Sequence, residues 1–411
     1  MGIFSRKKPA VEDKLSTANQ PLIWGPTKAG TFVSERTAMQ TAAVYACVRV
    51  ISEAIASLPL HVYRYEDGGM RMDPQHHLYY LLHDAPNDEM TSFSFRETLM
   101  SHLLLYGNAY AQILRDGGGR VREIYPLLPN KMEVHRGADG KLYYTYWRDY
   151  DEARPQEKSG GITFKRDEIL HIPGLSHDGI SGYSPIDLAR NAVGLAAATE
   201  EYGSSFFKNG ANPGAILEYP GTLEEPDKVR VIWEALYKGG GNGNRLAVLE
   251  DGMTFKQVAL RPDQAQFLET RKFQINEIAR IFRVPLHMIG DLDKSSFNNI
   301  EQQSMEFVKY TLDPWVVRWE QALRQSLVLP SERGSTVIKF NLDGLLRGDY
   351  ATRMNGYATG IQNGFLSQND VRRLENLNPI PNGDTYAVNG NMVDLDNIGA
   401  AYGTNGGNGD A

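Results

Sequence analysis

Apolar residues recur at helical spacing in several long stretches of the chain. In residues 37–58 they lie three or four positions apart, and Pro59 ends the pattern. We expect Thr37 to cap this helix, with Gln40 at the third position. A second helix is predicted over residues 91–106. The apolar face of the first helix consists of Val44, Cys47, Val48, Ile51, Ile55 and Leu58.

Short alternating stretches, separated by turn residues, predict β-strands. The first covers residues 60–65. Glycine-rich turns at residues 116–119 and 137–140 then separate pairs of strands, which is typical of hairpins. The pattern predicts an antiparallel sheet with helices beside it, which is an α+β fold. The remaining strands are expected at residues 109–115, 120–128, 131–136, 141–148, 162–165 and 169–172.

Two long helices bracket a small segment of mixed character. Ser184 caps the first helix, residues 185–208, and Asp187 completes its capping box. This helix is rich in small residues, which let another helix approach closely. The neighbour is either part of the same chain or a second copy, and the residues leave both interpretations open. The small residues expected at this contact are Ala192, Ala196 and Ala197.

The second long helix is predicted over residues 263–283, with Asp263 as its cap. Pro285 cannot continue it, so the helix is expected to end near Val284. Its apolar side consists of Phe267, Leu268, Ile275, Ile278 and Phe282.

A polar loop then leads into a third long helix. Asn298 is expected to cap it, with Glu301 closing a capping box. Pro314 lies inside the apolar pattern, where it removes a backbone donor and should kink the helix. Further along, Ser367 and Asp370 form a capping box for a short final helix. The apolar positions of the third helix are Met305, Val308, Leu312, Trp315, Val316, Trp319, Leu323 and Leu327.

Composition narrows the classes of function. The 411-residue chain has a net charge of −7, which argues against wrapping nucleic acid with one basic face. It does not exclude surrounding DNA without gripping it. Cys47 is the single cysteine, so no disulfide within the chain is expected. No run of eighteen uncharged apolar residues occurs, and no targeting segment is evident, so no membrane association is expected.

The chain carries little that points to catalysis or metal binding. The chain has no G-x-x-x-x-G-K-[ST] and no H-E-x-x-H motif, and no activated nucleophile is evident. Asp73, His76, His77 and His83 form one cluster that hints at a metal. Adjacent histidines on a helix point in different directions, so we expect no metal site. We therefore predict neither an enzyme nor a cofactor. If the chain were an enzyme after all, the alternative to a structural protein is a soluble hydrolase with a helical lid.

Three stretches together resemble a known family. Residues 263–283, the segment Arg283-Val-Pro-Leu-His-Met-Ile-Gly-Asp291 and the run Asn299-Ile-Glu-Gln-Gln303 are similar to the HK97-type portal proteins of tailed bacteriophages. The resemblance extends from about Thr37 to about Asn382. It implies a portal-type fold, with an antiparallel-sheet wing, a two-helix stem, a small α/β clip, a long kinked channel helix and a helical crown.

The resemblance also implies boundaries along the chain. Residues 1–36 would form a flexible arm, 37–180 the wing, 181–210 the first stem helix, 211–262 the clip, 263–284 the second stem helix, 285–298 the tunnel-loop region, 299–328 the kinked helix, 329–348 a strand returning to the wing, 349–382 the crown, and 383–411 a flexible tail.

The function implied is structural. Copies would form a ring, usually of twelve, at one capsid vertex of the virion, after assembly in the host bacterial cytoplasm. Double-stranded DNA would pass through the ring without sequence specificity. The implied partners are the terminase large subunit, the major capsid or scaffolding protein, and head-completion or adaptor proteins.

In the family, the loop before the kinked helix faces DNA. Lys294 would then repeat as a ring of positive charge, and Asp291 and Asp293 would keep its attraction for phosphates weak. Phe297 is expected to anchor the loop to the helix. The residues assigned to this DNA-channel loop are Asp291, Asp293, Lys294, Ser295, Ser296, Phe297 and Asn298.

Overall fold

The structure of the chain is a computed structural model. The structure describes residues 13–14, 27–66, 69–149, 159–208, 215–222, 225, 227–228, 231, 252–257, 264–291, 297–342, 350–375 and 377–387. The chain divides into two units, Met1–Asn341 and Leu342–Ala411, and each is described by itself.

The first predicted helix is two helices. Helix α1 covers Glu35–Ala38 and helix α2 covers Ala42–Ser57. Ser34 caps α1: its hydroxyl accepts a hydrogen bond from the Thr37 amide, and the Thr37 side chain binds the Ser34 amide in return. The prediction that Thr37 is the cap is therefore wrong. Both residue types cap helices well, so the sequence pattern could not rank the two positions. The apolar face predicted for residues 44–58 is buried.

The strands of the first unit form separate antiparallel sheets, where the sequence predicted one. Strand β2 (Leu60–Glu66) lies between β3 (Gly69–Met72) and β12 (Thr336–Phe340). Alternation indicates which residues form strands but not which strands pair, so the division was not predictable. The second sheet is β5 (Val121–Leu127), β4 (Asn108–Arg115) and β9 (Ile169–Pro173); the third is β1 (Asp13–Lys14), β6 (Met132–Arg136), β7 (Leu142–Trp147) and β8 (Gly161–Lys165).

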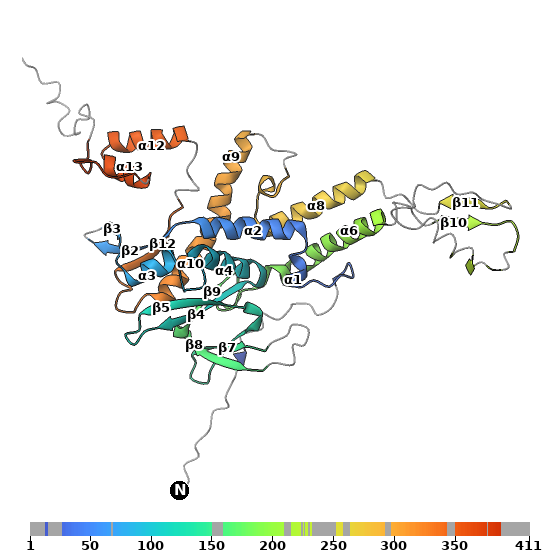
Figure 1. The fold of residues 1–411 in the computed structure, drawn as a ribbon, viewed down its shortest axis with the longest axis horizontal. Helices are drawn as coiled ribbons and strands as arrows, with labels where there is room; N and C mark the ends of the chain where they lie inside the picture. Colours follow the sequence, from blue (N-terminus) through green and yellow to red (C-terminus); the bar gives the residue numbers. More distant parts are fainter. Residues whose placement is uncertain are drawn as a thin grey trace, which may run out of the picture. The chain divides into compact units, whose positions relative to one another are not determined.

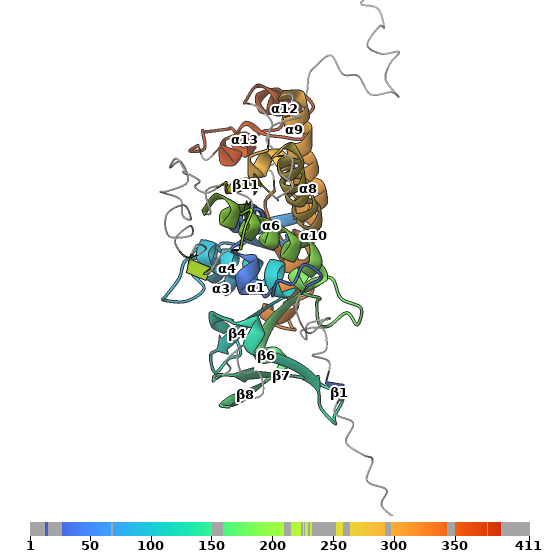
Figure 2. The same cartoon turned by 90° about the vertical axis from the view of Figure 1, so that its right-hand side faces the viewer.

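Helices cover these sheets. Helix α3 (His77–His83) precedes α4 (Ser92–Tyr106), which packs against α2 and against β4. In both views the third sheet lies beyond β4, away from α4 (Figures 1 and 2). Further along the chain, helix α10 (Asp313–Leu327) packs on β9 and β12. The combination of helices with antiparallel strands confirms the predicted α+β class.

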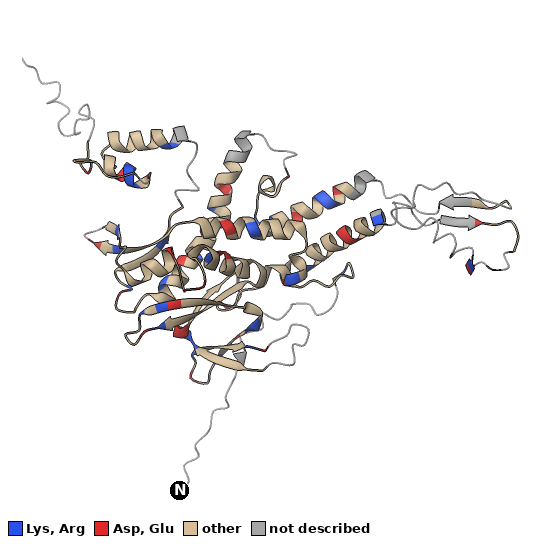
Figure 3. Cartoon of the chain, viewed as in Figure 1, with Lys and Arg blue, Asp and Glu red and all other residues tan. Residues whose placement is uncertain are grey.

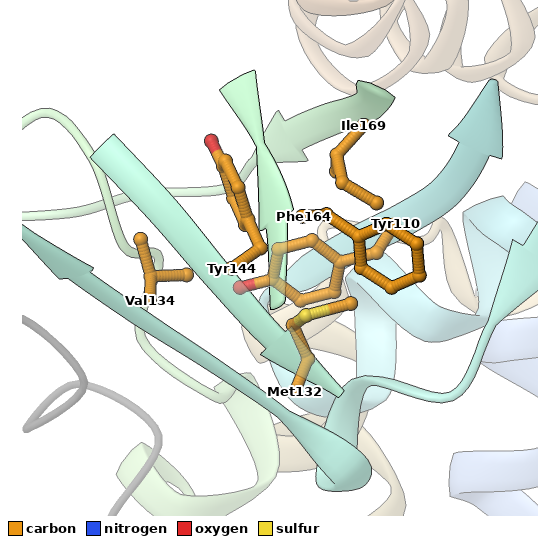
Figure 4. Close-up of a cluster of buried hydrophobic side chains, with 6 residues drawn as sticks. All are labelled: Tyr110, Met132, Val134, Tyr144, Phe164 and Ile169. Atoms are coloured by element: carbon orange, nitrogen blue, oxygen red, sulfur yellow. The ribbon is translucent and has the colours of Figure 1, made fainter. Parts of the chain in front are cut away.

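The second and third sheets share one apolar cluster (Figure 4). Tyr110 of β4 and Tyr144 of β7 contact edge to face, with ring centroids 6.2 Å apart. Both rings are removed from water, so each contributes a large buried apolar area. The cluster consists of Tyr110, Met132, Val134, Tyr144, Phe164 and Ile169.

A polar network borders this cluster. The Asn108 side-chain oxygen accepts a hydrogen bond from the Gly182 amide at 2.8 Å. Because this oxygen can only accept, His171 Nε2 is the donor in its 3.1 Å contact with the same atom. The Tyr144 hydroxyl then donates to His171 Nδ1 at 3.3 Å. Burial lowers the pKa of His171 to about 3. The imidazole is therefore neutral in the folded chain, with both ring nitrogens hydrogen-bonded.

The second unit contains helix α12 (Tyr350–Gln362) and helix α13 (Gln368–Leu374). Ser367 and Asp370 form the predicted capping box of α13. The Glu375 carboxylate joins the two helices, because it lies 2.9 Å from the Arg353 guanidinium and accepts from the Tyr357 hydroxyl at 2.9 Å.

Acid should destabilise the first unit through His171. Because the pKa of His171 is lower in the folded chain than in the unfolded one, the unfolded chain binds the additional proton. The stabilisation is present above about pH 6.5 and is lost as the pH falls toward 3, by about 1.4 kcal/mol per pH unit. We expect His171→Gln to flatten the pH dependence of the free energy of unfolding, measured by urea denaturation.

His177 provides the matched control, because its ring is exposed and stacks on Tyr183. His177→Gln should leave the pH dependence unchanged. Equal slopes for wild type and His171→Gln would show that His171 does not carry the effect.

Candidate functional site

The first feature of the site is the end of helix α8 (Gln264–Phe282). The helix stops close to Pro285, as predicted, and Arg283 takes a left-handed conformation with φ of 55°. A 3₁₀ turn, η4 (Leu286–Ile289), follows and leads to Asp291, whose amide donates to the Leu286 carbonyl at 3.1 Å. The chain therefore enters the polar loop from a defined turn.

The two sides of the loop are joined at its base. His287 Nδ1 donates to the Gln303 side-chain oxygen at 2.9 Å, and His287 Nε2 lies 3.5 Å from the Ser304 hydroxyl. The Thr311 hydroxyl donates to the Arg283 carbonyl at 2.7 Å. Spacing rules did not single out these contacts, although His287 and Gln303 lie in the segments that carry the portal resemblance. The base restrains the direction in which the loop leaves the helices.

The predicted channel residues are only partly described. Asp291 is half-buried at the end of the turn, while Asp293, Lys294, Ser295 and Ser296 lie outside the described residues. Helix α9 covers Phe297–Glu306, so Phe297 is its first residue and Asn298 its second. The prediction that Asn298 caps this helix is therefore wrong. The capping-box pattern was present, but the helix begins before it. The contact of the channel-loop residues with DNA stays a prediction.

The long helix is irregular just before Pro314. A π-helical segment, η5 (Phe307–Leu312), lies between α9 and α10, and the Asp313 amide donates to the Val308 carbonyl five residues back. Pro314 lies in the first turn of α10, where its missing N–H is tolerated. A π-helical turn is a known cause of helix bending. The kink predicted at Pro314 stays a prediction.

The apolar face predicted for this helix is buried over most of its length. Val308, Leu312, Val316, Trp319, Leu323 and Leu327 are all buried, and Trp315 is half-buried. Met305 is 52% exposed, so its assignment to the apolar face is wrong. It lies before the π-helical segment, where the helix no longer follows the α-helical period used for the prediction.

The predicted helix of residues 185–208 contains a short break. Helix α5 covers Pro185–Leu188 and α6 covers Arg190–Lys208, with Ala189 between them. Ser184 is the cap, as predicted: its hydroxyl accepts from the Asp187 amide at 3.1 Å and donates to the Leu105 carbonyl at 2.7 Å. This second contact ties the start of the helix to α4.

The small residues of α6 make contacts within the chain. Helix α6 packs against α8, and Ala196 is 5% exposed. Ala196 lines a cavity of about 140 Å³ together with Ala46 of α2 and Ile278 of α8. Ala192 and Ala197 are half-buried. Of the two interpretations left open by the sequence, the structure supports the intrachain contact for Ala196.

Other side chains of the same helices face outward. Leu268 is 57% exposed, so its assignment to the apolar side of α8 is wrong, and Phe273 is 56% exposed. On α6, Leu195 is 43% exposed. Charged residues of both signs are interspersed along both helices (Figure 3).

The segment between the two long helices is described in part. Strand β10 (Ala215–Glu218) pairs antiparallel with β11 (Thr254–Gln257), in the register Ala215 opposite Gln257. The predicted cap Asp263 and the predicted apolar residue Phe267 of α8 stay predictions. Asp263 lies outside the described residues, and the side chain of Phe267 is not described. No helix among the described residues has the length and apolar character needed to span a bilayer.

Comparisons with known proteins identify the family. The sequence pattern of the phage portal protein family matches residues 42–376. The chain is 39% identical over 381 residues to the probable portal protein of Streptomyces phage phiC31, covering 89% of this chain and 81% of that protein. It is 34% identical over 401 residues to the portal protein of Enterobacteria phage HK97, covering 95% of this chain and 92% of that protein.

A solved structure agrees with these matches. The chain resembles a protein in the neck of a native gene transfer agent particle, computed with C12 symmetry, with a TM-score of 0.57 and 26% identity. The match covers 89% of this chain and 97% of that one. The fold and the sequence matches together define a portal protein. The chain belongs to the phage portal protein family, which confirms the resemblance found in its sequence.

Overpacking should reveal the intrachain role of Ala196. We expect Ala196→Trp to lower the free energy of unfolding by about 1–3 kcal/mol, because Ala196 is 5% exposed on a helix that packs against α8 and a much larger side chain forces its neighbours to shift. Leu195→Trp is the control, since Leu195 faces outward on the same helix. The measurement is urea denaturation followed by circular dichroism. Equal stability of the two variants would place Ala196 away from a packed contact.

Proposed function

We propose that copies of this chain form a ring at one capsid vertex, through which double-stranded DNA enters and leaves. The observation that carries this proposal is the likeness to a neck protein solved with C12 symmetry, which covers 97% of that chain at 26% identity. Membership of the portal family supports the same function. Twelve subunits are the number that this likeness favours.

The proposed domains follow the chain. Residues 37–180 and the returning strand within 329–348 form the wing, and the pairing of β12 with β2 supports including that strand. Residues 181–210 and 263–284 form the stem, supported by the packing of α6 on α8. Residues 211–262 form the clip and residues 349–382 the crown. The flexible arm predicted for residues 1–36 is too long, because Thr31 donates to the Gly194 carbonyl at 3.0 Å, Val33 is buried and α1 begins at Glu35.

The loop within residues 285–298 is proposed to face the bore, followed by the kinked helix of residues 299–328. The contacts of His287 with Gln303 and of Thr311 with Arg283 support this role, because they restrain both ends of the loop. Twelve copies of Lys294 would then meet the DNA backbone. Asp291 and Asp293 would limit the attraction, since tight, salt-dependent phosphate contacts oppose sliding.

The proposed partners are those of a packaging vertex. The terminase large subunit would dock on the clip during packaging, and head-completion or adaptor proteins would replace it. The wing would contact the major capsid or scaffolding protein. The chain would assemble in the host cytoplasm and remain in the virion. Its role in this scheme is structural, without catalysis.

Ring formation can be tested at the exposed face of the stem. We expect the wild-type protein to run at many times the 45.9 kDa subunit mass and to appear as rings in electron micrographs. Phe273→Asp should shift the protein toward smaller species while circular dichroism stays unchanged, because Phe273 is 56% exposed on the proposed stem. Phe273→Leu keeps an apolar side chain and should form rings. Intact rings from Phe273→Asp would remove this residue from the subunit contact.

The channel loop can be tested by charge reversal. Lys294→Glu should leave ring assembly intact and reduce the DNA packaged or retained per procapsid, because a ring of positive charge becomes negative. Lys294→Arg keeps the charge and should package normally. Wild-type packaging by Lys294→Glu would place this loop away from the DNA path, whereas loss of rings would indicate a role in assembly.

A further inference from the structure

Three parts of the first unit that lie far apart in sequence meet at the start of α3. His76 is the N-cap residue of this helix and His77 is its first residue. Glu332 belongs to the turn between α10 and β12, where its amide donates to the Leu329 carbonyl. The hairpin turn between β4 and β5 is also near, because Asp116 and Arg120 both act electrostatically on His77.

The two histidines do not diverge as the sequence predicted. His76 precedes the helix, so the rule for neighbours on a helix surface does not apply to the pair. Their rings stack, with centroids 4.4 Å apart. Asp73 and His83, the other members of the predicted cluster, are engaged elsewhere: Asp73 pairs with Arg64 at 2.8 Å, and His83 stacks on Tyr79.

The donor atoms of His76, His77 and Glu332 lie close together. One ligand atom from each residue falls within 4.8 Å of the other two. His76 Nε2 lies 3.5 Å from Glu332 Oε2. Zinc bonds of 2.0–2.2 Å in a tetrahedron place two ligand atoms about 3.4 Å apart. One edge of such a site is therefore already formed, and the others need to shorten by up to about 1.4 Å.

These atoms are buried and poorly satisfied. His77 Nε2 is shielded from water and has no hydrogen-bond partner, and His76 Nε2 and Glu332 Oε2, also shielded, face only each other at 3.5 Å. His76 is 7% exposed as a whole residue. Buried polar atoms are nearly always hydrogen-bonded at normal distances, so this cluster requires a reason. A shared metal ion would satisfy all three at once.

We propose that His76, His77 and Glu332 bind a divalent transition-metal ion of the zinc class. Imidazole nitrogens with one carboxylate oxygen are a donor set that zinc prefers. The Glu332 side chain is 35% exposed, so water can supply a fourth ligand from that side. The ion joins α3 to the turn before β12 and thereby strengthens the return of the chain to its first sheet.

Proton and hydrogen-bond changes are compatible with binding. His76 Nδ1 accepts a hydrogen bond from the Leu78 amide at 3.2 Å, which places the ring proton on Nε2. Binding through Nε2 moves this proton to Nδ1 and breaks the capping bond. Helix caps contribute little beside the affinities of structural zinc sites, so the exchange favours the metal.

The test is zinc binding to the full-length protein. After dialysis against a chelator, titration with Zn²⁺ should show one ion bound per chain and an increase in Tm. Loss of a second-shell contact typically lowers metal affinity by about 10–100-fold, so His77→Gln and Glu332→Gln should each lower it at least tenfold. His83→Gln lies on the same helix outside the cluster and should bind as wild type.

The variants are checked by circular dichroism, so that loss of binding is not confused with unfolding. Should Glu332→Gln fail to fold, His77→Gln and the wild-type titration still decide the question. Absence of stoichiometric Zn²⁺ binding by the wild-type protein would overturn the proposal. Equal affinity of wild type and His77→Gln would overturn it too, because the ion would then bind elsewhere.

Discussion

The antiparallel pairing of β12 with β2 is the constraint on which the first unit depends. Thr336 lies opposite Arg64, and Phe340 lies opposite Leu60, so a strand late in the chain completes a sheet begun near its start. Helix α10 is joined to β12 by a turn and packs on both β12 and β9. Its course is therefore fixed at one end by a strand ladder and along its length by a second sheet.

A buried carboxylate reinforces this joint. Glu320 of α10 is 8% exposed, accepts a hydrogen bond from the Phe340 amide at 2.9 Å and lies 2.8 Å from the Lys339 ammonium group. A buried carboxylate needs hydrogen-bonding partners; the bond from the Phe340 amide is buried, whereas the Lys339 side chain is 46% exposed, so water partly screens the ion pair. The contact thus selects one register between helix and strand, because a shifted strand would leave the carboxylate without partners.

Local rules predicted what depends on local structure. The caps at Ser184 and Ser367 and the buried face of α2 followed from spacing alone. The predictions failed where two rules competed or where distant segments decide. Ser34 caps α1 where Thr37 was predicted to, and the sequence could not decide between them because both are good capping residues. Leu268 is exposed although its spacing suits an apolar face. The approach of Glu332 to His76 depends on the β12–β2 pairing, which no spacing rule reveals. The family resemblance supplied the function, which the isolated motifs did not.

The π-helical segment η5 changes which side of the long helix faces outward. A wider turn accommodates about one residue more than an α-helical turn, and one residue corresponds to a rotation of about 100°. Helix α9 is thereby out of phase with α10, which accounts for the exposure of Met305. In the proposed ring every subunit repeats the same phase offset. A local departure from α-helical winding would then determine which side of α9 is presented around the entire circumference of the bore.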